Sequence, residues 1–153
     1  MKALIVYMSV SHGNTKKIAD RISHILNADL AEAKDIDDPN FLSKYDLVGF
    51  GSGIFKGKLH ARLIKFVEKI PNQENKKSFI FSTSGTGKQS YHKEFKNLLQ
   101  EKGFDIIAEH SSKALDTYGF FKLFGGINKG RPNDKDLLKA EEFAKNIRDK
   151  IDS

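Results

Sequence analysis

Short apolar runs alternate along this chain with longer segments in which apolar residues recur every three or four positions. The short runs are typical of strands buried on both faces, and the longer segments are typical of amphipathic helices. The expected strands cover residues 2–8, 29–33, 46–52, 77–82 and 105–110. The expected helices cover residues 14–26, 59–70 and 90–102, with a short helix after Pro39 and a last helix capped by Asn133 or Asp134.

Strand and helix alternate five times, which predicts an α/β fold with a parallel sheet, helices on both faces and right-handed crossovers. We predict a doubly wound, five-stranded sheet in the order 2-1-3-4-5, formed by a single domain over residues 1–153. Polar, glycine-bearing loops follow the first, third and fourth strands, which are neighbours in this order. Ligands of such sheets bind beyond the carboxyl ends of the strands, so the three loops are expected to form one site there.

The first loop has the composition of a phosphate-binding turn. Its polar and flexible residues are Ser9, Ser11, Gly13, Asn14 and Thr15. The free N–H groups at the start of a helix, together with the helix dipole, bind a phosphate without a dedicated cation. The alternative is an ordinary strand-to-helix loop capped by Asn14 or Thr15. No Gly-Lys-(Ser/Thr) follows, which disfavours ATP or GTP.

Residues 7–15 read Tyr-x-Ser-x-Ser-His-Gly-Asn-Thr, which resembles the FMN-phosphate loop of the flavodoxin family, (Ser/Thr)-x-(Thr/Ser)-Gly-x-Thr. This chain departs from that pattern by one extra residue, His12, before the glycine. The resemblance covers nearly the whole chain and implies FMN as the cofactor. The residues that it assigns to the phosphate loop are Ser9, Ser11, His12, Gly13, Asn14 and Thr15.

The same resemblance implies that two further loops hold the isoalloxazine ring of FMN. It assigns to the second loop Ser52, Gly53, Ile54, Phe55, Lys56 and Gly57. It assigns to the third loop Thr83, Ser84, Gly85, Thr86, Gly87 and His92. In this family an aromatic residue often stacks on the flavin. Phe55 is the candidate for that role, with packing of the loop as its alternative, whereas for Tyr91 we favour packing in the core.

Several other patterns have weaker chemical meaning. Gly51, Gly53 and Gly57 give the spacing G-x-G-x-x-x-G, but it follows a later strand and not the first, so we discount a Rossmann fingerprint. The aspartates before Pro39 indicate a capped short helix more strongly than a metal site. The histidines His12, His60 and His92 fall near the expected site without metal-ligand spacing, so we expect helix starts or flavin-edge contacts and no metal.

The segment from Ser111 to Pro132 is too rich in glycine for a helix and longer than most loops. It resembles a tail found in a subset of the flavodoxin family. Its role is left open by the sequence.

Composition restricts the remaining possibilities. The chain has no cysteine, which excludes disulfides, thiolate metal sites and cysteine nucleophiles and fits the cytoplasm. No apolar run approaches the length of about 18 residues that a membrane span needs, and we see no signal peptide. The net charge is +6, whereas members of the flavodoxin family are commonly acidic. This charge favours partners with acidic docking surfaces, and its alternatives are nucleic acid or only a solvated surface.

The resemblance therefore implies a flavodoxin that acts as a low-potential one-electron carrier between redox partner proteins, and we expect it to be a monomer. The first alternative is an FMN-dependent NAD(P)H:quinone-type oxidoreductase, since flavodoxin-like folds host both functions. The second alternative is a basic interaction module on the same fold. Nucleic acid is a weak candidate for its partner, because the cations are scattered and no exposed aromatics lie between them. No set of nucleophile, base and orienting group is visible in the sequence.

Overall fold

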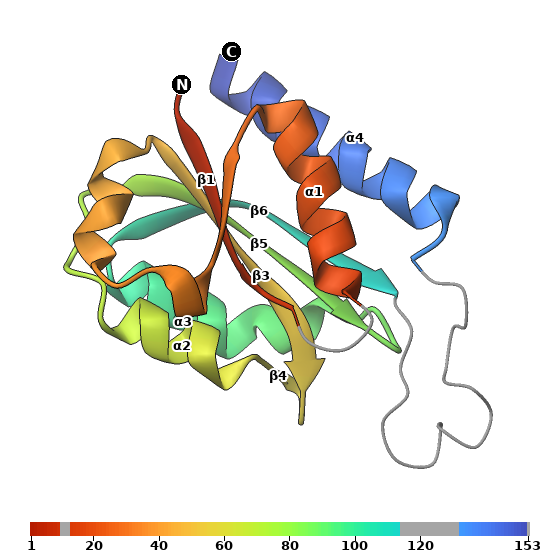
Figure 1. Ribbon diagram of the computed structural model, residues 1–153, viewed down its shortest axis with the longest axis horizontal. Coiled ribbons are helices and arrows are strands. Elements are labelled where there is room, and N and C mark those ends of the chain that lie inside the picture. Colours follow the sequence, from red (N-terminus) through yellow and green to blue (C-terminus); the bar gives the residue numbers. More distant parts are fainter. Residues whose placement is uncertain (10–12, 114–131, 153) are drawn as a thin grey trace.

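In the computed structural model, which describes residues 1–9, 13–113 and 132–152, a parallel sheet lies between two layers of helices (Figure 1). The strand order is β2-β1-β3-β5-β6, and the two-residue strand β4 pairs antiparallel with β3. The strands are β1 (Ala3–Met8), β2 (Asp29–Glu32), β3 (Leu47–Phe55), β4 (Lys58–Leu59), β5 (Lys76–Ser84) and β6 (Phe104–Lys113). With β4 left aside, this is the predicted order, so the predicted fold class is confirmed.

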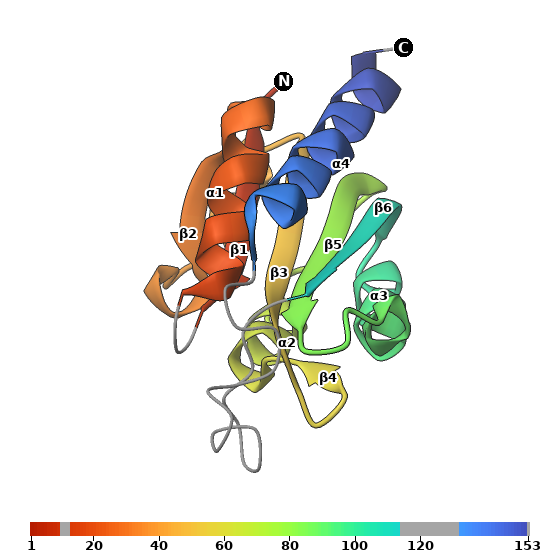
Figure 2. The ribbon, with the colours of Figure 1, turned by 90° about the vertical axis from the view of Figure 1, so that its right-hand side faces the viewer.

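The helices pack in pairs on the two faces of the sheet. Figure 2 shows α1 and α4 together on one face, with α2 and α3 on the other. The α-helices are α1 (Asn14–Leu26), α2 (Ala61–Glu68), α3 (Lys93–Glu101) and α4 (Asp134–Asp152). The short 3-10 helices are η1 (Ala33–Asp35), η2 (Pro39–Lys44) and η3 (Gln89–His92).

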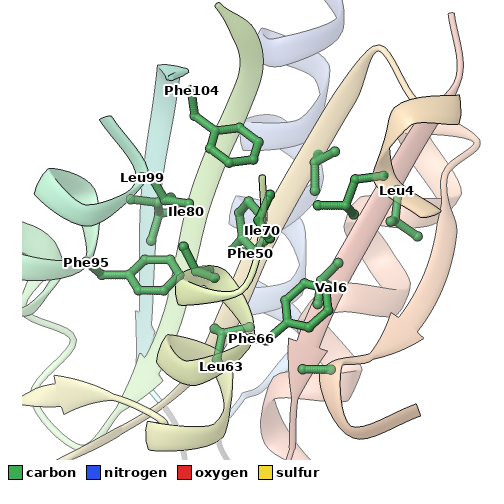
Figure 3. Packing of buried hydrophobic residues seen from close by; sticks show 14 of the residues in the cluster. Leu4, Val6, Phe50, Leu63, Phe66, Ile70, Ile80, Phe95, Leu99 and Phe104 are labelled. Atoms are coloured by element: carbon green, nitrogen blue, oxygen red, sulfur yellow. The ribbon is translucent and has the colours of Figure 1, made fainter. Parts of the chain in front are cut away.

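All six residues of β1 are buried, and their side chains alternate between the two faces. Residues 4, 6 and 8 join the cluster beneath α2 and α3, while residues 3, 5 and 7 join the cluster beneath α1 and α4. Figure 3 shows the first cluster, in which the Phe50 ring meets Phe95 and Phe104 edge to face at centroid distances of 5.9 and 5.5 Å. The sheet is thus held between two apolar layers, which leaves its carboxyl edge for a site.

Two glycines of β3 leave room for phenylalanine rings on β5. Gly49 pairs with Phe79 and Gly51 pairs with Phe81, and a Cβ at either glycine would lie about 2 Å from ring carbons. Gly51, which belongs to the glycine spacing noted above, therefore has a packing role and not a nucleotide-binding one.

The strands at the site extend further than hydrophobicity predicts. β3 continues to Phe55, β5 to Ser84 and β6 to Lys113, because backbone pairing persists between these strands beyond the last apolar residues. Leu59, expected at a helix start, instead lies in β4, and α2 begins at Ala61. The predicted caps are confirmed: Asp38 accepts from the N–H of Asn40 at the start of η2, and the Asn133 side chain accepts from the N–H of Asp136 in α4.

Candidate functional site

Three polar segments meet at the carboxyl edge of the sheet, as predicted. They are the start of α1, the hairpin formed by the end of β3 with β4, and the loop that follows β5. Figure 1 shows the arrowheads of β3 and β5 at the same edge as the first turn of α1. The three strands concerned are neighbours in the sheet, which is why their loops come together.

The first turn of α1 presents the positive end of a helix dipole at this edge. Gly13, at the N-cap, has left-handed backbone angles (φ 62°, ψ 27°), and a Cβ added there would meet no atom within 4 Å. Ser9 Oγ accepts a hydrogen bond from the N–H of Lys16 at 3.4 Å, so the hydroxyl of Ser9 lies at the start of the helix. The positive end of the helix dipole favours an anion at this position. Ser11 and His12 lie outside the described residues.

A buried hydrogen bond joins the first loop to the third. Thr15 Oγ1 lies 2.9 Å from Thr83 Oγ1, and both residues are buried. Asn14 is buried beside Thr15. The sequence assigned Thr15 and Thr83 to different parts of one site, and the structure brings them into direct contact.

The second segment is a tight hairpin. Ile54 pairs with Leu59 and Phe55 with Lys58, while Lys56 and Gly57 form the turn with φ angles of 52° and 77°. Positive φ at both central residues is what a type I′ turn requires.

Ser52 stabilises the base of this hairpin. Its Oγ accepts from the N–H of His60 and donates to the carbonyl of Gly53, at 2.9 and 2.7 Å. Ser52 is completely buried, so its role in the structure is to hold the loop.

Phe55 is a large apolar side chain that is exposed to solvent, with 43% of its surface accessible. Its ring packs edge to face on His60 at 5.2 Å and lies close to Gly53. His60 caps α2 by accepting from the N–H of Arg62, which confirms the expected helix start. Burial, with a smaller effect of Arg62, lowers the pKa of His60 and favours its neutral form. Phe55 is thus held at the edge with an apolar surface facing outward.

Short contacts within the third loop determine its shape. The N–H of Gly87 donates to Ser84 Oγ at 2.8 Å, and Thr86 Oγ1 donates to the Tyr91 hydroxyl at 3.3 Å. Gly87 has a φ of 66°, and a Cβ there would lie 3.1 Å from Lys113 Cγ. Tyr91 is half-buried beside Gly57 and lies outside both core clusters, so the expectation of core packing is wrong for this residue.

His92 does not reach the surface of the site. Its Nε2 lies 2.6 Å from Ser82 Oγ, its Nδ1 lies 3.2 Å from Glu109 Oε1, and its exposed fraction is 0%. Burial is the largest effect on the pKa of His92 and lowers it. The distances match those of a nucleophile, a base and an orienting acid, but Ser82 is equally inaccessible, so no substrate reaches it.

This buried set could not be found from the sequence. Ser82 and Glu109 are brought near each other by the pairing of β5 with β6. In this register Ile80 lies opposite Glu109 and Ser82 lies opposite Ser111, so Glu109 is two residues from the position that faces Ser82. Hydrophobic patterning carries no information about which polar side chains of two paired strands will meet.

Lysines surround the second and third loops. Lys56, Lys58 and Lys88 are exposed, as is Lys113 at the end of β6. Lys58 Nζ lies 3.2 Å from Glu94 Oε2, so part of its charge is balanced by an exposed carboxylate. The positive charge expected at this edge is present on the described residues.

Other features of the described residues do not compete with this site. A concave surface of about 560 Å³ lies at the opposite edge of the sheet, where Asp46 already accepts from the N–H of Lys2 and Lys76 donates to the Leu42 carbonyl. Within residues 1–9, 13–113 and 132–152, no three acidic or histidine side chains gather closely enough to hold a metal ion. None of the helices in these ranges has the length and apolarity needed to cross a membrane.

Comparison with known proteins agrees with this arrangement. Residues 4–127 match the family described as flavodoxin domain. A protein of Methanocaldococcus jannaschii, described as uncharacterized, is 51% identical over 149 residues, which are 96% of this chain and 98% of that protein. The chain belongs to the flavodoxin family.

Solved structures of flavodoxins have the same fold. A flavodoxin from the domain Archaea superposes with a TM-score of 0.74 and 22% identity, over 100% of both chains. The oxidised flavodoxin 2 of Bacillus cereus superposes with a TM-score of 0.71 and 23% identity, over 98% of this chain and 99% of that one.

Proposed function

We propose that this protein binds one FMN per chain at the carboxyl edge and carries single electrons between redox partner proteins. The observation that carries the proposal is the convergence of three polar loops at the start of α1, in a chain of the flavodoxin family. Bound FMN would supply the one-electron chemistry, while the protein binds it and determines its potential.

The residues present suit the parts of FMN. The backbone N–H groups at the start of α1 and the hydroxyls of Ser9 and Thr15 are donors for a phosphate. The space beside Gly13 admits a group that a side chain would otherwise occupy. Phe55 offers an exposed aromatic surface for the isoalloxazine ring. The hairpin that ends β3 and the third loop, which follows β5, lie next to each other because β3 and β5 are paired.

A carrier needs no catalytic side chain of its own. Ser82 and His92 are completely buried, and the sequence contains no second nucleotide fingerprint after a strand. We therefore favour the carrier over the NAD(P)H:quinone-type oxidoreductase. The sequence contains no cysteine, which is compatible with the cytoplasm, and we place the protein there as a monomer.

Titration of the apoprotein with flavins tests the proposal. FMN is expected to bind with a stoichiometry of one, riboflavin more weakly because it lacks the phosphate, and FAD not at all. Preferential binding of FAD, or no uptake of FMN, would refute the cofactor assignment. Rapid oxidation of NADH or NADPH by the loaded protein with a quinone as acceptor would instead support the oxidoreductase.

The partner in this proposal is a protein with an acidic docking surface. Lys56, Lys58 and Lys88 lie on the loops around the site, and we call these three lysines the basic rim. A basic rim accelerates association with an acidic partner at low salt. The same cations should also stabilise negative charge on the reduced cofactor, by roughly 0.5–1 kcal/mol each if they lie within about 10 Å of the ring.

Charge reversal on the basic rim tests whether these lysines stabilise negative charge on the reduced cofactor. Lys56→Glu with Lys58→Glu is expected to make the potential of the second electron more negative by tens of millivolts at low salt, since about 1 kcal/mol corresponds to about 40 mV. Lys145→Glu, on an exposed position of α4, is the matched control for a change of charge away from the loops. An unchanged potential in the double variant would mean that these lysines point away from the ring.

A further inference from the structure

A chain of hydrogen-bonded polar side chains, buried at its inner end, lies directly behind the third loop. It runs from Ser82 on β5 through His92 at the end of η3 to Glu109 on β6, with distances of 2.6 and 3.2 Å. Lys96 on α3 continues it, since its Nζ lies 3.1 Å from Glu109 Oε2. Ser82 and His92 have an exposed fraction of 0%, whereas the side chains of Glu109 and Lys96 are 16% and 37% exposed.

The partners of His92 determine where its proton lies. An ionised carboxylate only accepts hydrogen bonds, so Nδ1, which faces Glu109, carries the hydrogen. The neutral ring then accepts at Nε2, and the hydroxyl of Ser82 donates to it. Ser111 Oγ lies near both atoms, at 3.4 Å from Ser82 Oγ and 3.5 Å from Nε2. The network is therefore complete with an uncharged imidazole.

This hydrogen bond closes a loop of the candidate site. Ser82 lies just before the loop of residues 83–91 and His92 lies just after it, so the bond between them ties the two ends of the loop together. Much of the loop is exposed, including Thr86, Lys88 and the two residues that follow. At its first residue, Thr83 is bonded to Thr15 in the turn that begins α1. The position of His92 is thus linked to both the ring loop and the phosphate loop.

A groove shows where water would enter if the loop loosened. It has a volume of about 260 Å³ and is lined by Gln89, Ser90, Lys93, Lys96 and Glu109. Water therefore already reaches Glu109 on the outer side, while the imidazole behind it is dry.

We propose that His92 is a positioning residue whose neutral imidazole holds the loop of residues 83–91 closed, and that protonation of this imidazole opens the loop. The closing of the loop is inferred from the hydrogen bonds of His92 with Ser82 and Glu109. Only its consequence for FMN rests on the proposed function. An open loop exposes the imidazole to water, where it binds a proton more readily than in the dry closed state. By linkage, acid must then favour the open loop.

The charged groups around His92 support the sign of this effect. Burial and Lys96 on α3 lower the pKa of His92 from its ordinary value of 6.5, against the opposing effect of Glu109 on β6. His110, the neighbour of Glu109 on β6, has its own pKa lowered to about 4 and so remains neutral above pH 5. His110 therefore stays uncharged in the pH range in which His92, once exposed by opening of the loop, would bind a proton.

Amide hydrogen exchange of the apoprotein measures loop opening without any ligand. After correction for intrinsic exchange rates, protection of residues 84–91 is expected to fall by at least about 3-fold and at most about 25-fold from pH 7 to pH 5. The upper limit is reached if the closed state binds no proton and the histidine of the open state has a pKa of about 6.5. In His92→Gln, which cannot be protonated, protection should not change with pH. His24→Gln, at an exposed histidine of α1, is the matched control and should behave as the wild type.

Binding of FMN to the same proteins is the second measurement. As the pH is lowered from 7 to 5, the affinity for FMN is expected to fall more steeply in the wild type than in His92→Gln. The comparison of the two proteins removes the effect of the phosphate of FMN, whose own pKa is about 6. If no FMN binds at either pH, the proposed function fails while the exchange experiment still tests the loop.

Two results would overturn the inference: wild-type protection that is unchanged at pH 5, or a pH effect that persists in His92→Gln. Should that variant not fold, Ser82→Ala removes the closing bond and keeps the imidazole. It is expected to raise loop exchange already at pH 7, and unchanged exchange in it would equally refute the proposal.

Discussion

The contact between Thr15 and Thr83 allows a sharp test of the site. In the unliganded protein, Thr15→Ala removes a buried 2.9 Å hydrogen bond and leaves the Thr83 hydroxyl without this partner. An unmatched buried polar group costs about 1–3 kcal/mol, so the free energy of unfolding should fall by about 1–2 kcal/mol. In the complex, loss of a hydroxyl donor to a charged phosphate should weaken FMN binding by about 1–3 kcal/mol, or roughly 5- to 150-fold.

Two assays separate these effects. Denaturant unfolding of the apoprotein measures stability, and quenching of flavin fluorescence measures affinity for FMN and for riboflavin. Riboflavin has no phosphate, so its affinity should change much less. Thr15→Ser retains the hydroxyl and is the matched control. With Thr83→Ala, the single and double variants form a cycle in which we expect a coupling energy of about 1 kcal/mol.

Two results would contradict this reasoning. Equal loss of affinity for FMN and riboflavin would mean that Thr15 acts through the fold and not through the phosphate. Strict additivity of the two alanine variants in the apoprotein would mean that the hydrogen bond between the loops contributes nothing measurable.

Three further substitutions test the fold around the site. Gly51→Ala places a Cβ about 2 Å from the Phe81 ring and should lower the free energy of unfolding by about 1–3 kcal/mol, with partial rescue by Phe81→Leu in a urea titration. Gly103→Ala combines a φ of 93° with a Cβ 2.0 Å from the Gln73 carbonyl oxygen, and should lower the midpoint of thermal unfolding by several degrees or prevent folding. His110 has its pKa lowered to about 4, chiefly by burial, so its contribution to stability is present above pH 6.5 and is lost as the pH falls toward 4. This loss is at most about 3 kcal/mol, and stability curves against pH should show it as the difference between the wild type and His110→Gln.

The periodicity of the chain was enough to determine the class of fold. A strand buried on both faces must be apolar throughout, and a helix that covers a sheet must be apolar on one side, so β1 and α1 are recognisable without a structure. Their alternation leaves few topologies, and the order of the strands then brings three loops to one edge. Gly13, Thr15 and Thr83 could be assigned to that edge for this reason.

Which side chains of these loops face outward depended on the tertiary structure. Ser52, Thr83 and His92 are all polar residues at a strand end or a helix start, and nothing in their local sequence distinguishes them from surface residues. Each is buried and bonded to a partner that only the fold brings close: the N–H of His60, the hydroxyl of Thr15, and the carboxylate of Glu109. The backbone pairing of β3, β5 and β6 also continues into the polar segments, because hydrogen bonds between strands do not require apolar side chains. Such pairings are set by the register of strands far apart in the chain, and so the closing of the third loop by His92 could be seen only in the folded molecule.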